Sequence, residues 1–182
     1  MIYTWNELIK KEGSRSSLES LIANGKYKRI SHGIYSDSGD DTDLEMIFAR
    51  YPRSVLTLQS AFEYYGLSTY IPEKYYIATP RNSCVIDDNR VCQSYMSNDI
   101  INVGRVVDNT KYGRIYIYDL ERLLIELFRY KNKLPRDYFL EIINSYRPLF
   151  ENNKISFFTL EEYSRYFKNG LKIIRNIQEV FA

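Results

Sequence analysis

The sequence predicts an α+β fold, in which a small N-terminal unit of two helices and a β-hairpin precedes a mixed domain of a small β-sheet packed with helices. Helix-capping signals and apolar stripes with helical spacing recur within residues 3–25, and polar–apolar alternation follows directly after them. From residue 44 onward, strand-like runs lie between helical patterns. We therefore expect one domain at residues 1–36, an acidic linker at 37–43 and a second domain at 44–182.

The first helix is predicted in the run YTWNELIKKEG. Thr4 and Glu7 have the spacing of a capping box, in which each side chain accepts a hydrogen bond from the backbone of the other residue. Gly13 suits the C-cap, where a left-handed backbone is common. The apolar stripe consists of Trp5, Leu8 and Ile9.

The second helix is predicted in the run SRSSLESLIANG. Ser16 and Glu19 repeat the capping-box spacing, and Gly25 suits the second C-cap. The face expected to be buried consists of Leu18, Leu21 and Ile22. The face expected to be exposed carries Arg15, Ser17, Ser20 and Asn24.

A β-hairpin is predicted in the next eleven residues, because KYKRIS and GIYS alternate polar and apolar residues about His32 and Gly33. The residues expected to point inward are Tyr27, Ile30, Ile34 and Tyr35. Two helices, a short turn and a hairpin in this order are typical of a winged helix-turn-helix. The N-terminal unit is therefore expected to bind DNA.

The second domain is predicted to begin with two helices. The run LEMIFARY stops before Pro52, and the run LTLQSAFEYY is ended by Gly66. Strands are expected in the four runs KYYIAT, RVCQSYM, IINVGRVV and GRIYIY.

Three helices are predicted to close the chain. Asp119 caps the run LERLLIELFRYKN, and Pro135 occupies the first turn of PRDYFLEIINSYR. Thr159 and Glu162 have capping-box spacing for a last, long helix that ends at Phe181.

The positive charge is concentrated in the N-terminal unit. The whole chain has a net charge of only +2, which gives no general argument for nucleic-acid binding. Residues 1–36, however, hold six basic and three acidic side chains, whereas the remainder holds 19 basic and 20 acidic ones. The excess therefore coincides with the helices and the hairpin.

The candidate DNA-binding residues follow from this arrangement. A recognition helix presents its N-terminal residues to base edges, so Arg15 just before the helix is expected to donate to guanine O6 and N7. Side chains on the helix that suit bases or phosphates are Ser16, which is also the expected N-cap, Ser17, Ser20 and Asn24. Wing residues expected to contact phosphates or the minor groove are Lys26, Lys28, Arg29 and His32, with ordinary solvated charge, or for His32 a plain turn residue, as the alternative.

The sequence contains no motif that indicates catalysis, a metal or a cofactor, so we expect a protein that is not an enzyme. Cys84 and Cys92 have no metal or redox spacing and are expected to be reduced cysteines on strands of a cytoplasmic protein. The acidic run at 37–43 lacks the spacing of a calcium loop. Asp119 and Glu121 follow a strand as some nuclease carboxylates do, but an N-cap and a favourable helix dipole explain them more simply. We expect neither a signal peptide nor a membrane span.

The sequence resembles the AbiEi family, the antitoxins of type IV toxin–antitoxin systems that act in abortive infection, a form of phage defence. The similarity covers the chain to about residue 130. In the winged unit it rests on Leu18, Leu21, Gly25, Arg29, Gly33, Ile34 and Tyr35. In the second domain it rests on Ser60, Ala61, Gly66 and Leu67, and on the runs PEKYYIATP and IYIYDLERLLIELFRY.

This resemblance implies a transcriptional autorepressor that binds double-stranded DNA at repeats in its own promoter. It also implies an antitoxin that counteracts a nucleotidyltransferase-like toxin without a stable complex, with antitoxicity assigned to the C-terminal domain. Family members usually have a further helix before the pair found here. We therefore expect either a trimmed winged unit or one whose core is completed by a helix of the C-terminal domain, with base recognition that is weaker or that needs two copies of the chain, as in a homodimer.

Two other functions stay open at this level. The C-terminal domain is a candidate interaction module that binds a toxin or a second copy of the chain. A metal-dependent nuclease targeted to DNA by the winged unit is the other alternative.

Overall fold

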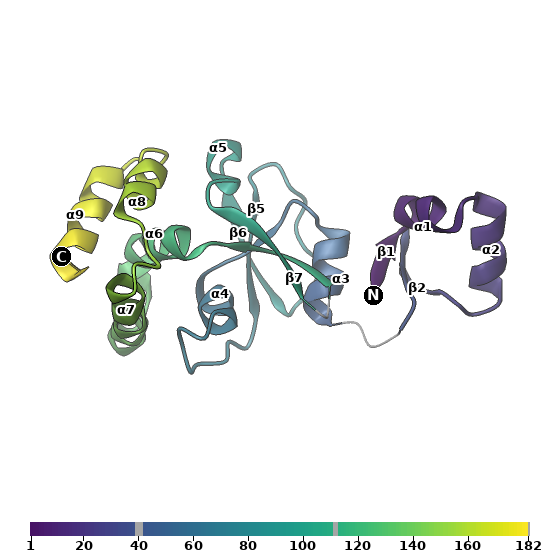
Figure 1. Cartoon of the computed structure of the whole chain (residues 1–182), viewed down its shortest axis with the longest axis horizontal. Helices are drawn as coiled ribbons and strands as arrows, with labels where there is room; N and C mark the ends of the chain where they lie inside the picture. The colour runs from purple at the N-terminus through teal and green to yellow at the C-terminus, as the bar shows by residue number, and fades with distance from the viewer. Residues whose placement is uncertain (39–41, 111–112, 182) are drawn as a thin grey trace. The chain divides into compact units, whose positions relative to one another are not determined.

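The computed structural model describes residues 1–38, 42–110 and 113–181, and it is a mixed α+β protein, as predicted (Figure 1). Its internal contacts divide the chain into two compact units. Unit 1 comprises Met1–Arg53 and Val107–Tyr116, and unit 2 comprises Ser54–Val106 and Ile117–Ala182. The division into residues 1–36, 37–43 and 44–182 was drawn from the sequence pattern and stays a prediction.

Unit 1 begins with the N-terminal segment, by which we mean residues 1–36. Its elements are β1 (Ile2–Thr4), α1 (Trp5–Glu12), α2 (Arg15–Ala23), β2 (Lys28–Ser31) and β3 (Ile34–Ser36). The strands form an antiparallel sheet in the order β1-β3-β2. The sequence pattern missed β1, because three residues show no alternation and the partner strand lies thirty residues further along the chain.

A small apolar core holds the two helices against this sheet. Leu8 of α1, Leu18 of α2, Tyr27 and Tyr35 are buried. Partly buried side chains surround them: Tyr3, Trp5, Ile9, Leu21 and Ile22. The predicted capping box of α1 is confirmed, since the Thr4 amide donates to Glu7 Oε2 over 2.8 Å and the Glu7 amide donates to Thr4 Oγ1 over 3.4 Å.

The start of α2 differs from the prediction. Ser14, not Ser16, is the N-cap, and its hydroxyl oxygen accepts a hydrogen bond from the Ser17 amide over 3.1 Å. Gly13 ends α1 with a left-handed φ of 85°, and the chain re-enters a helix directly after Ser14. Arg15 is therefore the first residue of α2 instead of the residue before it.

Helix α3 (Asp43–Arg50) begins within the run predicted as a linker. Thr42 is its N-cap and forms a capping box with Glu45, a signal that the sequence reading overlooked. Residues 39–41 of the predicted linker lie outside the described residues. The helix ends at Arg50 before Pro52, as predicted.

Eleven further helices and strands follow α3 among the described residues, together with one 3₁₀ turn. They are β4 (Val55–Leu56), α4 (Leu58–Tyr64), β5 (Tyr75–Pro80), β6 (Val91–Met96), α5 (Asn98–Ile101), β7 (Arg105–Thr110), β8 (Gly113–Tyr118), α6 (Leu120–Tyr130), η1 (Lys131–Lys133), α7 (Arg136–Glu151), and finally the helices α8 (Phe157–Ser164) and α9 (Gly170–Phe181). The strands form a sheet in the order β6-β5-β4-β8-β7. Strand β5 is parallel to β6 and antiparallel to β4.

Three predictions about these elements were wrong in detail. The run at 100–107 is not one strand, because α5 ends at Ile101 and Gly104, with a left-handed φ of 69°, turns the chain into β7. The last helix is two helices. Helix α8 is capped by Ser156 instead of by Thr159, and the chain turns before α9. Pro135 is the N-cap of α7 and not part of its first turn.

The break between α8 and α9 requires a glycine. A Cβ atom at Gly170 would lie 2.0 Å from the carbonyl oxygen of Ser164. Ser164 lies only six residues earlier in the chain, so this contact belongs to the tight turn between the two helices. Helical periodicity does not register such a turn, and it therefore predicted a continuous helix.

A buried ion-pair network lies in unit 2. Arg122 and Glu126, both on α6, are fully buried, and their closest charged atoms are 2.7 Å apart. Arg122 also donates to the carbonyl oxygens of Ile100 and Val103, each over 2.9 Å. Arg129 donates to the same carboxylate over 2.7 Å. The network ties α6 to α5 and to the turn that follows it.

The described helices include none with the length and apolar character needed to cross a membrane.

Candidate nucleic-acid interface

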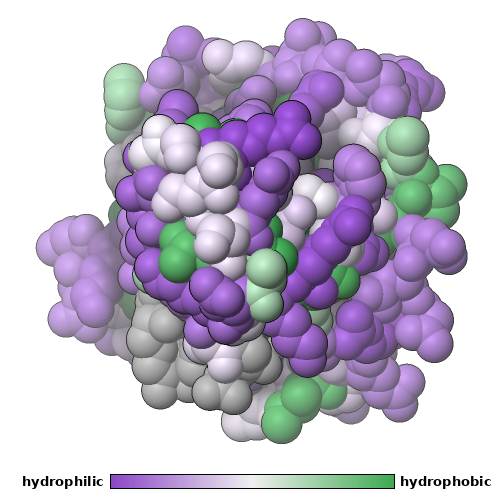
Figure 2. All heavy atoms as spheres, turned by 90° about the vertical axis from the view of Figure 1, so that its right-hand side faces the viewer, coloured by the Kyte–Doolittle hydropathy of each residue, from purple (hydrophilic) through white to green (hydrophobic). Residues whose placement is uncertain are grey.

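The nine predicted DNA-binding residues are all exposed. Those on α2 and at its C-cap are Arg15, Ser16, Ser17, Ser20 and Asn24, and those on the connection, β2 and the hairpin turn are Lys26, Lys28, Arg29 and His32. Figure 2, which faces the α2 side of the N-terminal segment, shows a mostly hydrophilic surface with separated hydrophobic residues. This surface is polar, as groove binding requires.

Helix α2 separates its apolar and polar side chains cleanly. Leu18 is fully buried, and at about 100° per residue Ser16 and Ser20 lie on the opposite side of the helix. Within the described part of the chain, the hydroxyls of Ser16 and Ser20 make no hydrogen bond. Because Ser14 takes the capping role, Ser16 keeps its hydroxyl available to a ligand.

Arg15 forms an ion pair with Glu19, which was predicted to form a capping box with Ser16. Its Nε atom donates to Glu19 Oε1 over 2.8 Å, and the two side chains are 76% and 53% exposed. The i,i+4 spacing of an arginine and a glutamate was the available sequence signal. The pair lies beside the outward face formed by Ser16 and Ser20.

Lys26 is held by an ion pair within the segment. Its Nζ lies 3.1 Å from Glu12 Oε1, and the Tyr27 hydroxyl donates to the same oxygen over 2.5 Å. The hydrogen bonds from Tyr27 and Lys26 lower the pKa of Glu12, and the bond to Glu12 raises the pKa of Lys26. Lys26 therefore connects α1 to the chain after α2, and Glu12 offsets its charge.

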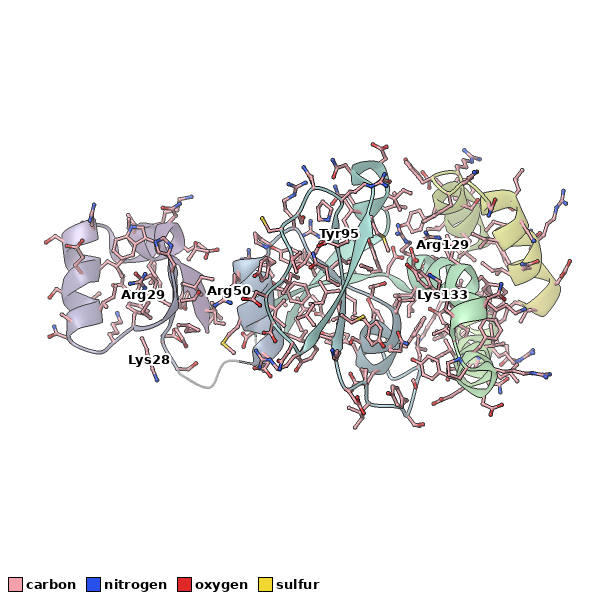
Figure 3. All side chains as sticks on the ribbon, turned by 180° about the vertical axis from the view of Figure 1, so that it is seen from behind. Lys28, Arg29, Arg50, Tyr95, Arg129 and Lys133 are labelled. Carbon is pink, nitrogen blue, oxygen red and sulfur yellow. The ribbon has the colours of Figure 1, made fainter. Side chains whose placement is uncertain are left out.

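Lys28 and Arg29 differ from Lys26 in having no carboxylate partner among the described residues. Both lie on β2, an edge strand of the sheet, and their side chains leave it in different directions (Figure 3). The Arg29 Nε donates to the Ser31 carbonyl oxygen over 3.3 Å, next to an irregularity in the pairing of β2 with β3. The charges of both side chains are free to neutralise an anion.

The turn of the hairpin has the form that the sequence predicted. His32 and Gly33 connect β2 to β3, and Gly33 has a left-handed φ of 73°. His32 is exposed, with no hydrogen bond among residues of the described chain. His32 lies at the tip of the hairpin. This position is compatible with both predicted roles, a plain turn residue or a contact to the DNA backbone.

A second polar cluster, missed by the sequence reading, lies across α1 and the sheet. Lys11 Nζ donates to the Tyr3 hydroxyl over 2.8 Å, and that hydroxyl donates to Asp37 Oδ2 over 3.1 Å. The hydrogen bond with Tyr3 raises the pKa of Lys11. Lys11 also lies 4.2 Å above the Tyr3 ring, so it fixes β1 to the helix and contributes positive charge to the segment.

The two carboxylates considered for nuclease chemistry are hydrogen-bonded within unit 2. Asp119 caps α6 by accepting from the Arg122 amide over 2.8 Å, and it accepts from the Tyr163 hydroxyl over 2.9 Å. Burial raises the pKa of Asp119 against these bonds. Glu121 accepts from the Ser156 amide over 3.0 Å. Among residues the structure describes, no group of three or more histidine, cysteine, aspartate or glutamate side chains is arranged to hold a metal ion.

Of the two cysteines, Cys92 lies on a strand as predicted and Cys84 does not. Cys92 lies on β6, whereas Cys84 lies in the connection between β5 and β6, and both are exposed free thiols.

Comparison with known proteins adds no assignment. No model of a protein family matches the chain, and no curated protein matches it.

Proposed function

We propose that the N-terminal segment is a winged helix-turn-helix that binds double-stranded DNA. The observation that carries this proposal is the combination of an outward polar face on α2 with two cations on β2, Lys28 and Arg29, which have no carboxylate partner among the described residues. A closed core under both elements holds them as one unit. A helix and a wing of this kind are the usual means of placing side chains in a groove and beside phosphates.

In this mechanism α2 enters the major groove. Ser16 and Ser20 contact base edges or phosphates, and Arg15 donates to guanine, which contributes about 1–3 kcal/mol of discrimination. Lys28 and Arg29 contact phosphates and release about one counterion each, which makes binding depend on salt. Specificity then comes from α2 and affinity mainly from the wing.

We infer from the resemblance to the AbiEi family that the protein is an autorepressor and the antitoxin of a type IV toxin–antitoxin system. Its DNA target is then the repeats in its own promoter, and it counteracts a nucleotidyltransferase-like toxin. The motifs in residues 54–130 support the antitoxin role of the C-terminal domain.

A second function is favoured by exposed apolar side chains in unit 2. Ile71, Phe158 and Leu171 are 77%, 76% and 82% exposed. Exposed apolar side chains mark an interaction surface where they lie together, and the partner here would be the toxin or a second copy of the chain. Co-purification with the product of the neighbouring gene separates this function from repression alone.

The test of DNA binding uses the full chain and duplex DNA from immediately upstream of its own gene. Affinity is measured for this duplex and for a scrambled duplex across a series of salt concentrations. Preference for the upstream duplex supports the repressor function. Equal, weak and steeply salt-dependent binding to both duplexes contradicts it and would leave the C-terminal domain as the functional part of the chain.

A further inference from the structure

The Arg15–Glu19 pair has a geometry that the stability of the fold does not require. Arg15 is the first residue of α2, where the helix dipole disfavours a cation. Glu19 lies one turn later and holds the Arg15 Nε over 2.8 Å. With side chains that are 76% and 53% exposed, such a pair contributes little to folding. The pair is therefore available for a role in binding.

The pair leaves the end of the arginine available. Glu19 occupies Nε, so the two terminal nitrogens of the guanidinium, which form a planar fork, keep their donors for a ligand. Nothing in the described part of the chain accepts from these terminal nitrogens. Guanine O6 and N7 match such a fork in the major groove.

Glu19 also changes the electrostatics of the same surface. A carboxylate beside the outward face of α2 repels phosphates, and it therefore weakens binding to DNA of every sequence. Arg15 recovers affinity where a guanine accepts its fork. Glu19 thus disfavours binding to DNA in general, and through Arg15 it favours the site that contains the guanine.

We propose that Glu19 is a positioning residue that presents Arg15 to a guanine and makes α2 selective for a site containing that base. The inference rests on the DNA-binding function proposed above. It predicts a specific pattern: loss of Glu19 raises affinity for scrambled DNA while it lowers preference for the correct guanine. Simple removal of a negative charge raises affinity for both kinds of DNA equally.

The experiment uses the full chain and the part of its upstream DNA that it protects in a footprint. Each guanine is replaced in turn by 7-deazaguanine, which lacks the N7 acceptor. We expect one position at which the replacement weakens binding of the unaltered protein about tenfold and leaves Arg15→Ala unaffected. At that position Glu19→Ala loses most of the tenfold sensitivity, and its affinity for scrambled duplex rises.

Glu19→Gln is the conservative variant. The glutamine carbonyl still accepts from the Arg15 Nε without a negative charge. It is expected to keep the guanine sensitivity and to bind scrambled DNA more tightly, as Glu19→Ala does. Glu161→Gln, an exposed glutamate on α8, changes the net charge by the same amount and serves as the matched control.

The outcomes separate the two proposals. If the unaltered protein prefers its upstream DNA but Glu19→Ala keeps full sensitivity at the guanine, the positioning role is overturned and the DNA-binding function stands. Equal gains in the affinity of Glu19→Ala for the upstream and the scrambled duplex overturn the positioning role in the same way. If the unaltered protein shows no preference for its upstream DNA, both proposals fall.

Discussion

Two arginine–glutamate pairs in this protein share one local pattern and have different surroundings. Arg15–Glu19 on α2 and Arg122–Glu126 on α6 are both i,i+4 pairs, with closest distances of 2.8 and 2.7 Å. The first pair is 76% and 53% exposed, and the second is 0% exposed at both residues. Distance and spacing therefore do not reveal what a pair does, whereas burial does.

The surroundings of the buried pair explain its role. Arg122 lies 4.3 Å from the ring centroid of Tyr118 and 4.7 Å from that of Phe167, and it donates to two backbone carbonyls. Every charge in this network has a partner, which is the condition under which buried ions are tolerated. The exposed pair has water on most sides and can exchange its partner for a ligand at little cost.

The largest effect is expected from breaking the buried pair. Glu126→Ala leaves Arg122 buried without its carboxylate, and we expect a loss of about 3–5 kcal/mol in the free energy of unfolding, measured with urea. Glu19→Ala, the same change in the exposed pair, is expected to cost less than about 0.5 kcal/mol. Similar losses in both variants would remove the distinction drawn here.

The next largest effect on stability is expected from replacing a glycine, and two glycines with similar backbone conformations allow a comparison. Gly104 has a φ of 69°, and a Cβ there would lie 2.5 Å from Arg122 Cβ and 2.9 Å from Asp119 Oδ1. Gly25 has a φ of 77° with nothing within 4 Å of its Cβ position. Gly25→Ala is expected to cost about 1–2 kcal/mol from backbone strain alone.

Gly104→Ala is expected to cost about 1–3 kcal/mol more, because the new methyl group collides with packed side chains. Urea unfolding of both variants measures the difference. Equal losses would mean that packing around Arg122 yields more easily than the structure indicates.

The exposed pair is expected to matter for binding instead of stability. Arg15→Ala should leave the free energy of unfolding unchanged, because the side chain is exposed and its ion pair is screened by solvent. It should reduce the preference for upstream over scrambled DNA by about 1–3 kcal/mol, measured by titration at fixed salt. A stable variant with full preference would show that Arg15 does not contact a base.

A smaller effect separates two lysines of the same segment. Lys28 has no carboxylate partner among the described residues, whereas Lys26 lies 3.1 Å from Glu12. Lys28→Ala should weaken binding to all duplexes and reduce the slope of log affinity against log salt by about one. Lys26→Ala should change this slope less, because Glu12 already offsets the charge of Lys26. Equal changes of slope in the two variants would show that the ion pair with Glu12 does not matter for binding.

The smallest effect concerns two carboxyl groups whose pKa values are shifted in opposite directions. Hydrogen bonds from Tyr27 and Lys26 lower the pKa of Glu12, whose contribution to stability is therefore present above its ordinary value of 4.5 and lost at lower pH. Burial raises the pKa of Asp119 above its ordinary value of 3.8. Asp119 therefore disfavours folding when ionised and loses this penalty as the pH falls through its raised pKa.

Urea unfolding between about pH 7 and pH 3 tests both signs. The stability of the unaltered protein relative to Glu12→Gln should fall with pH. Its stability relative to Asp119→Asn should rise with falling pH. The same sign for both pairs would mean that burial does not dominate at Asp119.

Local signals predicted the elements whose determinants lie within a few residues. The capping box of Thr4 and Glu7, the glycine that ends α4 and the turn at His32 and Gly33 were all predicted from such signals. The sequence did not predict whether Ser14 or Ser16 caps α2, because both side chains can accept the capping hydrogen bond. The tight turn at Gly13 places Ser14 at the N-cap position of α2.

The sequence predicted which residues belong to the candidate site, but it did not predict which of them form hydrogen bonds or ion pairs with each other. The pattern about Leu18 predicted which residues of α2 are exposed, because helical periodicity settles the side on which a residue lies. It did not show that Ser16 is spared from capping, that Lys26 is held by Glu12, or that β1 completes the sheet. Contacts between residues distant in the chain leave no periodic trace in the sequence.

The sequence by itself determined an α+β protein, the helices and hairpin of its first 36 residues and the exposed polar face of α2, because periodicity and capping act over one or two turns. Only the tertiary structure decided which of two equally spaced arginine–glutamate pairs is buried. Burial depends on what packs against a helix: α5 and Phe167 enclose Arg122, and no element encloses Arg15 within the described chain.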